Sequence, residues 1–600
     1  MRKSFIRLIL ISLALAVALT AGCSSSTRVP EEKFVTVIVE SSPDYYCAES
    51  VVRAKKNSDV TVRLTAGAND TFGGVDYADY EFTQSVSGNQ QLIDLTLHRV
   101  RYSTVISPEI KRGVTAPEGA AAYYSNDGTD EVQYSAMSDA HLRFNTRAAD
   151  RKFIREGYVQ IGWNTQADGK GTHIGFGSRY EKGENTTLYA EWEKACAEEN
   201  FVYTLKDNRA TVVKYTGTDK DLVIPRTLGG CRVANISGGA VTDRSFGKIV
   251  LPDTVARIMP RAFERVTAEE IYLFDNPSFV AHDSFESCTF TTLHINAARA
   301  PYYSGTYFDA FTDKCDRLIS IADEKKIILA AGSSTRFGFD SALLDAEFED
   351  YEIVNMGVFA YANMLPEYMI ISSYAKAGDI LVSTPEFDTV ETQFCTTTDI
   401  DYAIFAMVES NYDLFARIDC KLITNVIPAF ADHIARRYGT SLSYDISAYD
   451  FDEDGNPCEE PSYNKYGDYV VPRPNNEELK LFGTRRACYN KKYFPEEYIE
   501  SLNDAYALFT EKGVTVLFEY SPRSRTSITD DSDYLTAAEL GLYLENQLTV
   551  PVIGQIEDSL MSAYYFFGTD NHLSDDGVQI YTKRVTEEIK KYLYTHPERN

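Results

Sequence analysis

The stretch from Ile327 to Ser341, IILAAGSSTRFGFDS, constrains the fold more than any other part of the chain. Ile327–Ala331 is a short apolar run that is typical of a buried parallel strand. The run stops at Gly332, two serines follow, and a helical pattern starts at Ser341. A strand that passes through small residues into a helix places hydroxyl groups at the carboxyl edge of an α/β sheet, where open α/β folds bind their ligands.

The two serines, Ser333 and Ser334, have two interpretations. Their hydroxyl groups can simply cap the turn or the helix that follows. Alternatively, one of them is a nucleophile that lies near helix N-terminal amides, which suit a developing oxyanion. The local sequence alone favours capping, and the argument for chemistry depends on a histidine far downstream.

The C-terminal part of the chain, residues 324–597, alternates apolar strands with helical stretches. The expected strands are 327–331, 351–357, 379–384, 514–520 and 549–554, and the expected helices are 365–374, 423–438, 496–512, 537–547 and 578–594. This alternation predicts a three-layer α/β domain, in which helices cover both faces of a parallel sheet. The acidic segment 440–490, rich in Tyr, Asn and Pro, is interpreted as a long insertion.

The N-terminus has the features of an export signal. Three basic residues in the first seven precede the apolar segment Leu8–Leu19, which is too short to favour a membrane-spanning helix. The sequence LTAGC follows, with small residues directly before Cys23, and resembles a bacterial lipoprotein signal. We therefore expect a signal peptide (1–22), a lipid on Cys23, a tether (23–33) and attachment to the membrane at the extracytoplasmic cell surface. An ordinary secretory signal with a chance cysteine is the alternative.

Two β modules are expected next. Residues 34–118 largely alternate apolar and polar residues, which predicts a β-sandwich-like module. Residues 119–195 contain GYVQIGWNTQADGKGTHIGFGSRY and NTTLYAEW, a pattern that resembles the internalin-type B repeat, a small surface module. Both tryptophans of the chain, Trp163 and Trp192, occur here, and we expect them in the core of this thin module.

Residues 199–301 repeat themselves. LVIPRTLGGCRVANISGGAV is answered by IVLPDTVARIMPRAFERV, and Phe263 and Phe285 recur at equivalent places of successive repeats. A period in the twenties predicts a solenoid with one short strand per turn. The pattern resembles the BspA-type leucine-rich repeats of bacterial surface antigens, which implies a protein or glycan ligand on the strand face. Residues 302–323 are interpreted as a linker to the last domain.

Charge and cysteine spacing exclude several classes of function. The net charge of −29 argues against nucleic-acid binding, because a phosphate backbone requires Lys and Arg. Ten cysteines are present, but apart from Cys23 they are scattered widely and none stands in a C-x-x-C pair. This spacing argues against a metal or redox pair and predicts buried free thiols. We expect no metal and no cofactor.

His572 gives the serines a chemical partner. It lies in FFGTDNHLSDDGVQIYTKRV, between an apolar strand end and a helix that begins near Gly577. A serine nucleophile requires a base within hydrogen-bond reach and donors for the oxyanion. Ser334 on the first strand–helix loop and His572 before the last helix satisfy this requirement. The alternative is that His572 only packs or caps, and Asp570 is the acid closest to it without an evident capping role.

With these residues the domain resembles the SGNH (GDSL-type) hydrolases. Gly332-Ser333-Ser334 stands in the place of their G-D-S block, so Ser334 matches the nucleophile. The sequence VNMG matches the second block at Gly357. His572 matches the histidine of the D-x-x-H block, although Thr569 stands three residues before it. The third block, G-x-N-D, is replaced by STPEFD, and Asn355 or Asn363 would have to supply its asparagine.

The resemblance implies a surface-anchored serine esterase that removes O-acyl groups from cell-wall or environmental glycan. Ser334 would be the nucleophile, His572 the base and Asp570 its orienter. The oxyanion donors would be the amides of Ser334 and Gly357, with Asn355. The alternative is a non-catalytic surface adhesion protein, in which the repeats and a degenerate hydrolase-like domain bind glycan or protein. The missing G-x-N-D block favours adhesion, and the retained serine and histidine favour the enzyme.

Overall fold

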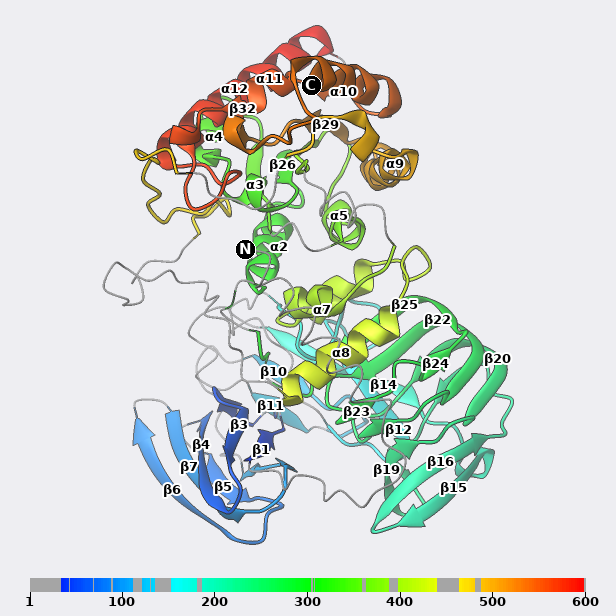
Figure 1. The fold of residues 1–600 in the computed structure, drawn as a ribbon. Helices are drawn as coiled ribbons and strands as arrows, with labels where there is room; N and C mark the ends of the chain where they lie inside the picture. The colour runs from blue at the N-terminus through cyan, green and yellow to red at the C-terminus, as the bar shows by residue number, and fades with distance from the viewer. Residues whose placement is uncertain are drawn as a thin grey trace, which may run out of the picture.

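The protein is a multidomain, mixed α/β molecule with several separate sheets, some of them parallel (Figure 1). The computed structural model describes residues 34–597, except for 41, 43, 68–69, 88–89, 112–120, 130, 135–152, 181–185, 300, 304–305, 307, 359–362, 388–397, 440–462 and 481–486. The N-terminal sheets lie at one end of the molecule and the C-terminal α/β domain lies at the other. The prediction of several domains is therefore confirmed at this level.

The first module, residues 34–111, consists of mainly antiparallel sheets around one core. One sheet contains β1 (Phe34–Val39), β3 (Val51–Lys55) and β8 (Thr104–Ile106), and another contains β2 (Tyr46–Cys47), β4 (Ser58–Gly67), β7 (Gln90–Val100) and β6 (Tyr80–Ser87). A short pair, β5 (Thr71–Gly74) and β9 (Glu109–Lys111), closes the module. Alternate side chains of β1, β4 and β7 meet in a single apolar core, as the period-two pattern predicts.

The second module is one five-stranded sheet. Its order is β11 (Val132–Tyr134), β10 (Ala122–Tyr124), β14 (Thr187–Lys194), β12 (Tyr158–Asn164) and β13 (His173–Ile174). Trp163 is fully buried, with ring centroids 5.1 Å from Tyr123 and 5.8 Å from Phe176. The indole N–H of Trp192 donates to the carbonyl of Ser125 at 2.7 Å. Trp163 therefore has the core role that the sequence predicts, whereas Trp192 is partly buried and packs against the same core.

The third module stacks mainly parallel strands in two sheets. One sheet runs β15 (Phe201–Lys206), β16 (Arg209–Tyr215), β19 (Cys231–Ile236), β21 (Arg257–Ile258) and β23 (Phe279–Val280), and β18 (Thr227–Leu228) pairs with β19. The antiparallel pairs of this module are β15 with β16 and β18 with β19. The other runs β17 (Leu222–Val223), β20 (Val241–Val250), β22 (Phe263–Phe274) and β24 (Phe285–Glu286), and β25 (Thr289–Asn296) pairs with β22.

The repeat of the sequence is visible in the register of this third module. Val241 pairs with Phe263, and Phe263 pairs with Phe285. The rings of Phe263 and Phe285 stack with centroids 4.3 Å apart. Successive turns of the chain therefore place the same apolar position one above the other, which is the physical origin of the sequence period.

The C-terminal domain is built on a five-stranded parallel sheet. Its order is β27 (Glu352–Asn355), β26 (Lys326–Ala330), β28 (Ile380–Ser383), β29 (Thr515–Glu519) and β31 (Val552–Ile553). One face packs on α4 (Ser341–Asp345) and α12 (Asp575–Thr595). The other packs on α5 (Met364–Ser372), α9 (Glu496–Thr510) and α10 (Tyr534–Gln547). Helices thus cover both faces, as the strand and helix alternation predicts.

Smaller elements complete this domain. They are α7 (Tyr402–Val408), η5 (Tyr412–Arg417), α8 (Val426–Gly439), η6 (Lys491–Tyr493), β30 (Arg523–Ser524), η7 (Arg525–Ser527), α11 (Ile556–Ser559), β32 (Leu560–Met561) and η8 (Ala563–Tyr565). The first three form a layer between the sheet and the third module (Figure 1).

The segment interpreted as a linker contains a packed helix. Within 302–323, α2 (Ala310–Ser320) buries Phe311, Cys315 and Leu318 in the same apolar core as the sheet. These three side chains recur at helical spacing and so form one face of α2. The linker interpretation is therefore wrong for 310–320. This segment is a helix of the core, and its amphipathic pattern is short and interrupted by several charged residues.

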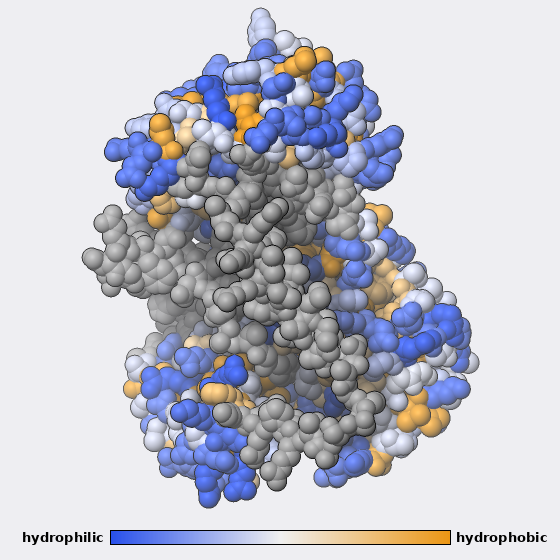
Figure 2. All heavy atoms as spheres, in the orientation of Figure 1, coloured by the Kyte–Doolittle hydropathy of each residue, from blue (hydrophilic) through white to orange (hydrophobic). Residues whose placement is uncertain are grey.

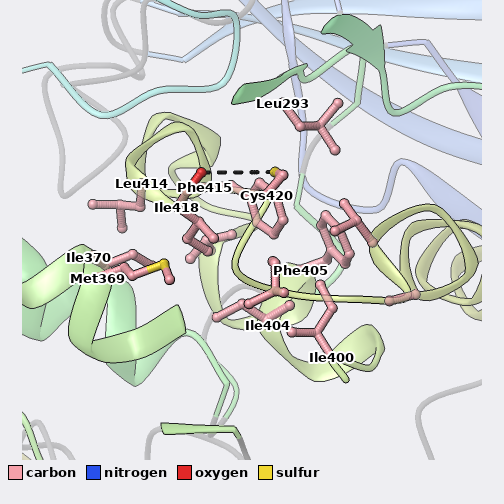
Figure 3. Packing of buried hydrophobic residues seen from close by; sticks show 14 of the residues in the cluster. Leu293, Met369, Ile370, Ile400, Ile404, Phe405, Leu414, Phe415, Ile418 and Cys420 are labelled. Atoms are coloured by element: carbon pink, nitrogen blue, oxygen red, sulfur yellow. Dashed lines mark hydrogen bonds between the residues drawn. The ribbon is translucent and has the colours of Figure 1, made fainter. Parts of the chain in front are cut away.

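Apolar packing and buried charge join the third module to the α/β domain. Figure 3 shows Leu293 of β25 in the same cluster as Phe415, Cys420 and Phe405. Deeper in this junction the guanidinium of Arg437 on α8 donates to the carboxylate of Asp275 at 2.7 Å.

Glu409 completes this buried charge cluster. Its Oε1 lies 2.8 Å from Nε of Arg437, and its Oε2 accepts from the backbone N–H of Tyr303 at 2.7 Å. The side chains of Arg437, Asp275 and Glu409 are at most 1% exposed. The buried charge of Arg437 is stable in the folded protein only while the carboxylates of Asp275 and Glu409 both pair with it.

Surface and thiol chemistry agree with the sequence. Hydrophilic side chains dominate the described surface on the face that Figure 2 shows. Cys47, Cys196, Cys315 and Cys420 are buried free thiols, as the wide spacing of the cysteines predicts. Within the described ranges no helix has the length and apolarity needed to cross a membrane.

Replacing Asp275 with alanine should destabilise the junction between the third module and the α/β domain. The change leaves Arg437 buried with one fewer carboxylate, and we expect the free energy of unfolding to fall by about 3–5 kcal/mol. Urea denaturation followed by circular dichroism measures the loss. Asp243→Ala is the matched control, because Asp243 pairs with Arg265 where both side chains are more than half exposed, and there we expect a much smaller loss. Equal losses in the two variants would contradict the role of the buried charge.

Candidate active site

The sheet order creates a topological switch point at the start of the C-terminal domain, and we call this region at the carboxyl end of β26 the crevice. β26 has β27 on one side and β28 on the other, so the connections that leave these neighbouring strands diverge from its carboxyl end. In open α/β sheets this point is where ligands bind. The chain leaves β26 through Gly332 and enters a four-residue helix, α3 (Ser333–Arg336), before α4 begins at Ser341. The short helix was not predicted, and it places both serines directly at the crevice.

A carboxylate from the next strand holds the start of α3. Ser333 Oγ donates to Glu386 Oε1 at 3.0 Å, and the backbone N–H of Ser334 donates to the same oxygen at 2.6 Å. Glu386 follows β28 and is 1% exposed, and Ser334 is fully buried. The loop that lacks the expected asparagine therefore supplies an acceptor where a donor was expected.

Asn571 connects this carboxylate to the predicted nucleophile. Its Nδ2 donates to Glu386 Oε2 at 2.8 Å and to Ser334 Oγ at 3.1 Å, and lies 3.5 Å from Ser333 Oγ. Because Ser334 Oγ accepts this bond, its own proton is available to a base. Sequence reasoning passed over Glu386 and Asn571; the signal for Asn571 is its position directly before His572.

His572 lies in the same crevice but faces an aromatic ring. Its imidazole centroid is 4.1 Å from that of Phe337, and its backbone N–H donates to Thr569 Oγ1 at 3.0 Å. Within the described ranges, no hydrogen bond joins its ring to Ser334 or to Asp570. Burial, followed by the charges of Arg336, Arg473 and Arg523, lowers the pKa of His572 to about 3. The imidazole is therefore neutral and weakly basic in this arrangement.

Asp570 lies beside a different partner. Its Oδ1 is 3.4 Å from Nη1 of Arg523, and its backbone carbonyl accepts from the N–H of Ser524 at 2.8 Å. Arg523 also lies 3.9 Å from Glu386 Oε2. The structure thus brings Asp570 to Arg523 rather than to His572, and its role as the orienting acid stays a prediction.

The three predicted oxyanion donors are all close to Ser334, and all are engaged. The N–H of Ser334 donates to Glu386, and the N–H of Gly357 donates to Asn355 Oδ1 at 2.9 Å. Asn355 Nδ2 donates to the carbonyl of Thr335 at 3.2 Å and to Asp468 Oδ1 at 3.0 Å. Asn363, the other candidate, caps α5 through the N–H of Leu365. Oxyanion stabilisation would require at least one of these bonds to open.

Gly357 has a steric reason to be glycine. A Cβ at this position would lie 2.3 Å from the backbone nitrogen of Arg336 and 2.8 Å from Thr335. Its carbonyl accepts from Nζ of the buried Lys314 on α2 at 2.6 Å. The loop after β27 is therefore pressed against α3, and the helix missed in the supposed linker helps to hold it there.

Known proteins give no independent assignment. No protein-family model matches the chain, and no curated protein sequence matches it. In the described ranges, no group of three or more His, Cys, Asp or Glu side chains is arranged to hold a metal ion.

The imidazole of His572 should stay neutral across the range in which an ordinary histidine titrates. Because the folded pKa is near 3 and the unfolded value is near 6.5, the ring should gain no proton between pH 8 and pH 5. Heteronuclear NMR of 13C-labelled histidines, assigned with His572→Gln, measures this directly. The urea-unfolded chain is the control. A midpoint above pH 6 would show that a carboxylate faces the ring, as the prediction for Asp570 requires.

Proposed function

We propose that the C-terminal domain is an SGNH-type serine esterase that removes O-acyl groups from cell-wall or environmental glycan. The observation that carries the proposal is the position of Ser334. Its hydroxyl lies just beyond the carboxyl end of β26 and accepts from Asn571, the residue next to His572. Ser334 follows the first strand of the parallel sheet and His572 precedes the last helix, which are the places that the resemblance to these hydrolases leads us to expect.

The reaction is acyl transfer through Ser334. His572 takes the proton of Ser334 Oγ as the oxygen attacks the acyl carbonyl carbon, and a tetrahedral oxyanion forms. The carbon–oxygen bond to the sugar breaks, and the sugar oxygen receives the proton from His572. Water then attacks the acyl-serine and gives up a proton to His572. The bond between the acyl carbon and Ser334 Oγ breaks, Oγ receives the proton from His572, and the carboxylic acid leaves. No metal or cofactor takes part in these steps.

Two local movements are required for this chemistry. The His572 ring must turn from Phe337 toward Ser334, and Glu386 must release the N–H of Ser334 to the oxyanion. The amide of Gly357 becomes a second donor if Asn355 turns away. These are side-chain rearrangements, and substrate contacts would have to supply their free energy.

The N-terminal modules are proposed to present the enzyme at the cell surface. The stacking of equivalent positions in successive turns supports a short leucine-rich solenoid of the BspA type, and the tryptophan-centred sheet agrees with a B-repeat-like module. A protein or glycan would bind the strand face of the solenoid. Lipidation of Cys23 and attachment to the membrane stay predictions, because residues 1–33 lie outside the described ranges.

The second candidate is a non-catalytic adhesion protein. It is favoured by the engagement of all three predicted oxyanion donors and by the packing of the His572 ring on Phe337, with no hydrogen bond from the ring to Ser334 in the described ranges. A site that only binds glycan or protein needs neither a free oxyanion hole nor a base.

A fluorophosphonate probe should distinguish the two candidates by labelling Ser334. Ser333 Oγ already donates its proton to Glu386, whereas the proton of Ser334 remains available to His572. Mass spectrometry of the labelled peptide identifies the serine. We expect Ser334→Ala and His572→Ala to abolish labelling and Ser333→Ala to retain it. A label on Ser333 would overturn the assignment, and no label on any serine would favour the adhesion protein.

Replacing Glu386 with asparagine should raise kcat. The change removes an acceptor that competes for the N–H of Ser334 and adds an amide donor of the type that the resemblance leads us to expect. One oxyanion donor is worth about 10²–10³ in kcat, so a gain of about tenfold or more is expected on p-nitrophenyl acetate. Glu386→Ala is the control, with a smaller gain, because it removes the carboxylate without adding a donor. Loss of activity in both variants would mean that the carboxylate itself takes part in the reaction.

A further inference from the structure

Three cationic side chains gather beside the candidate active site. Lys314 on α2, Arg336 on α3 and Arg473 between Tyr469 and α9 form what we call the cationic wall. The guanidinium carbon of Arg336 lies 5.0 Å from the ring centroid of Tyr463 and 5.1 Å from that of Tyr469. Nζ of Lys314 lies 5.3 Å from the Tyr463 centroid. Two of the three cations therefore share one aromatic ring.

Arg473 brings the wall up to His572. Its guanidinium lies 5.6 Å from the ring of Phe337, the ring that packs on the imidazole, and its Nη1 donates to the Phe337 carbonyl at 3.0 Å. Arg336 lies two residues after Ser334 in the same short helix. The cationic wall therefore lies near both residues of the proposed chemistry: Arg336 is in the same helix as Ser334, and Arg473 lies beside the ring that packs on His572.

The burial of these cations is energetically costly. Lys314, Arg336 and Arg473 are 3%, 5% and 4% exposed in a chain whose net charge is −29. Like charges that are brought together away from water disfavour one another. Burial, with Arg336 as the next cause, lowers the pKa of Lys314 well below its ordinary value. The fold nevertheless keeps this basic cluster buried, although the chain has more Asp and Glu than Lys and Arg.

Among the described residues, two carboxylates, those of Asp468 and Asp575, act on the charge of Arg473. Asp468 is buried, and its oxygens accept from Ser341, Asn355 and Asn464. Asp575 lies 3.6 Å from Nε of Arg473, but its side chain is 61% exposed.

Nε of Arg473 is buried and makes no hydrogen bond within the described part of the chain, and its ion-pair partner there is the exposed Asp575 at 3.6 Å, so an anionic ligand would compete with Asp575 for this donor. The further acids of the crevice, Glu386 and Asp570, lie against Arg523 instead.

The crevice already binds one carboxylate of its own. Glu386 is held by Ser333 Oγ, the N–H of Ser334 and Asn571 Nδ2, all neutral donors. This arrangement shows that the groups around Ser334 are compatible with negative charge in the crevice. The guanidinium groups of Arg336 and Arg473 in the wall add formal positive charge next to them.

We propose that the site selects esters that carry an anionic group next to the ester bond, and that the cationic wall binds this group while the carbonyl lies against Ser334. This inference rests on the proposed esterase function and names its substrate class. The anionic group sits either on the acyl side, as in a half-ester of a dicarboxylic acid, or on the alcohol side, as in an acylated acidic sugar. Charge recognition of this kind gives specificity through paired charges in a partly desolvated site.

Two matched pairs of esters test the proposal on the full-length chain. Mono-4-nitrophenyl succinate against 4-nitrophenyl butyrate tests an acyl-side anion. 4-Acetoxybenzoate against its methyl ester tests an alcohol-side anion. We expect kcat/KM to be about tenfold or more higher for the charged member of one pair, and the pair that shows this locates the anionic group. Equal or lower values for both charged esters would overturn the proposal and leave the esterase function standing.

Variants of Arg473 assign the preference to the wall. Arg473→Gln should bring the ratio of kcat/KM within that pair close to one, and Arg473→Lys should keep part of the preference. The ratio within one variant is independent of how much of the protein is folded. The matched control is Arg525→Gln, an exposed arginine of the same domain whose Nε donates to the carbonyl of Leu560. A preference that is unchanged in Arg473→Gln would overturn the role of the wall.

A binding measurement separates failure of this inference from failure of the esterase proposal. If none of the four esters is cleaved, the esterase function is wrong, and calorimetry with succinate and with 4-acetoxybenzoate then decides the question of the anion. Binding that Arg473→Gln weakens about tenfold supports an anion site without catalysis. Absence of binding at millimolar concentration would overturn the inference as well.

Discussion

The buried charge of Arg437 is the interaction on which the arrangement of the molecule depends. It is satisfied by Asp275 from the third module and by Glu409 from the α/β domain, and neither part of the chain supplies both carboxylates. Around it, α7, η5 and α8 close an apolar core that continues from β25 to the parallel sheet. The free-energy cost of removing water from the Arg437 charge is offset only when both carboxylates pair with it. This pairing therefore holds the third module and the α/β domain together at this point.

The same junction reaches the candidate active site through α2. This helix lies between the last stacked strand and β26, and its Lys314 binds the carbonyl of Gly357. Gly357 in turn is pressed against α3, which carries Ser333 and Ser334. The position of the serines therefore depends on contacts that start outside the α/β domain, and the modules before residue 302 are structurally linked to any chemistry at this crevice.

The crevice contains two competing sets of interactions. Glu386 and Asn571 hold Ser333 and Ser334 in a closed network of side chains and backbone. The chemistry proposed for Ser334 and His572 needs some of these same donors. The carboxylate of Glu386 stands where the hydrolases that the sequence resembles have an amide donor, and this difference distinguishes the site from theirs. Glu386 is therefore the side chain that decides between a site that only binds and one that also catalyses.

The sequence by itself determined the elements whose signal is local, and the tertiary structure alone decided what surrounds Ser334. The apolar run at 327–331 overlaps β26 (Lys326–Ala330), and the repeat period corresponds to the stacking of Phe263 on Phe285. Buried strands and repeats produce such patterns in the sequence because an apolar residue is needed at each position that enters the core. By contrast, Glu386 and Asn571 are far from Ser334 in sequence, and no local pattern encodes that the backbone N–H of Ser334 donates to Glu386 while its hydroxyl accepts from Asn571. The residues of the site could therefore be proposed from sequence, whereas their partners could not, because hydrogen bonds between distant segments depend on the relative placement of whole elements.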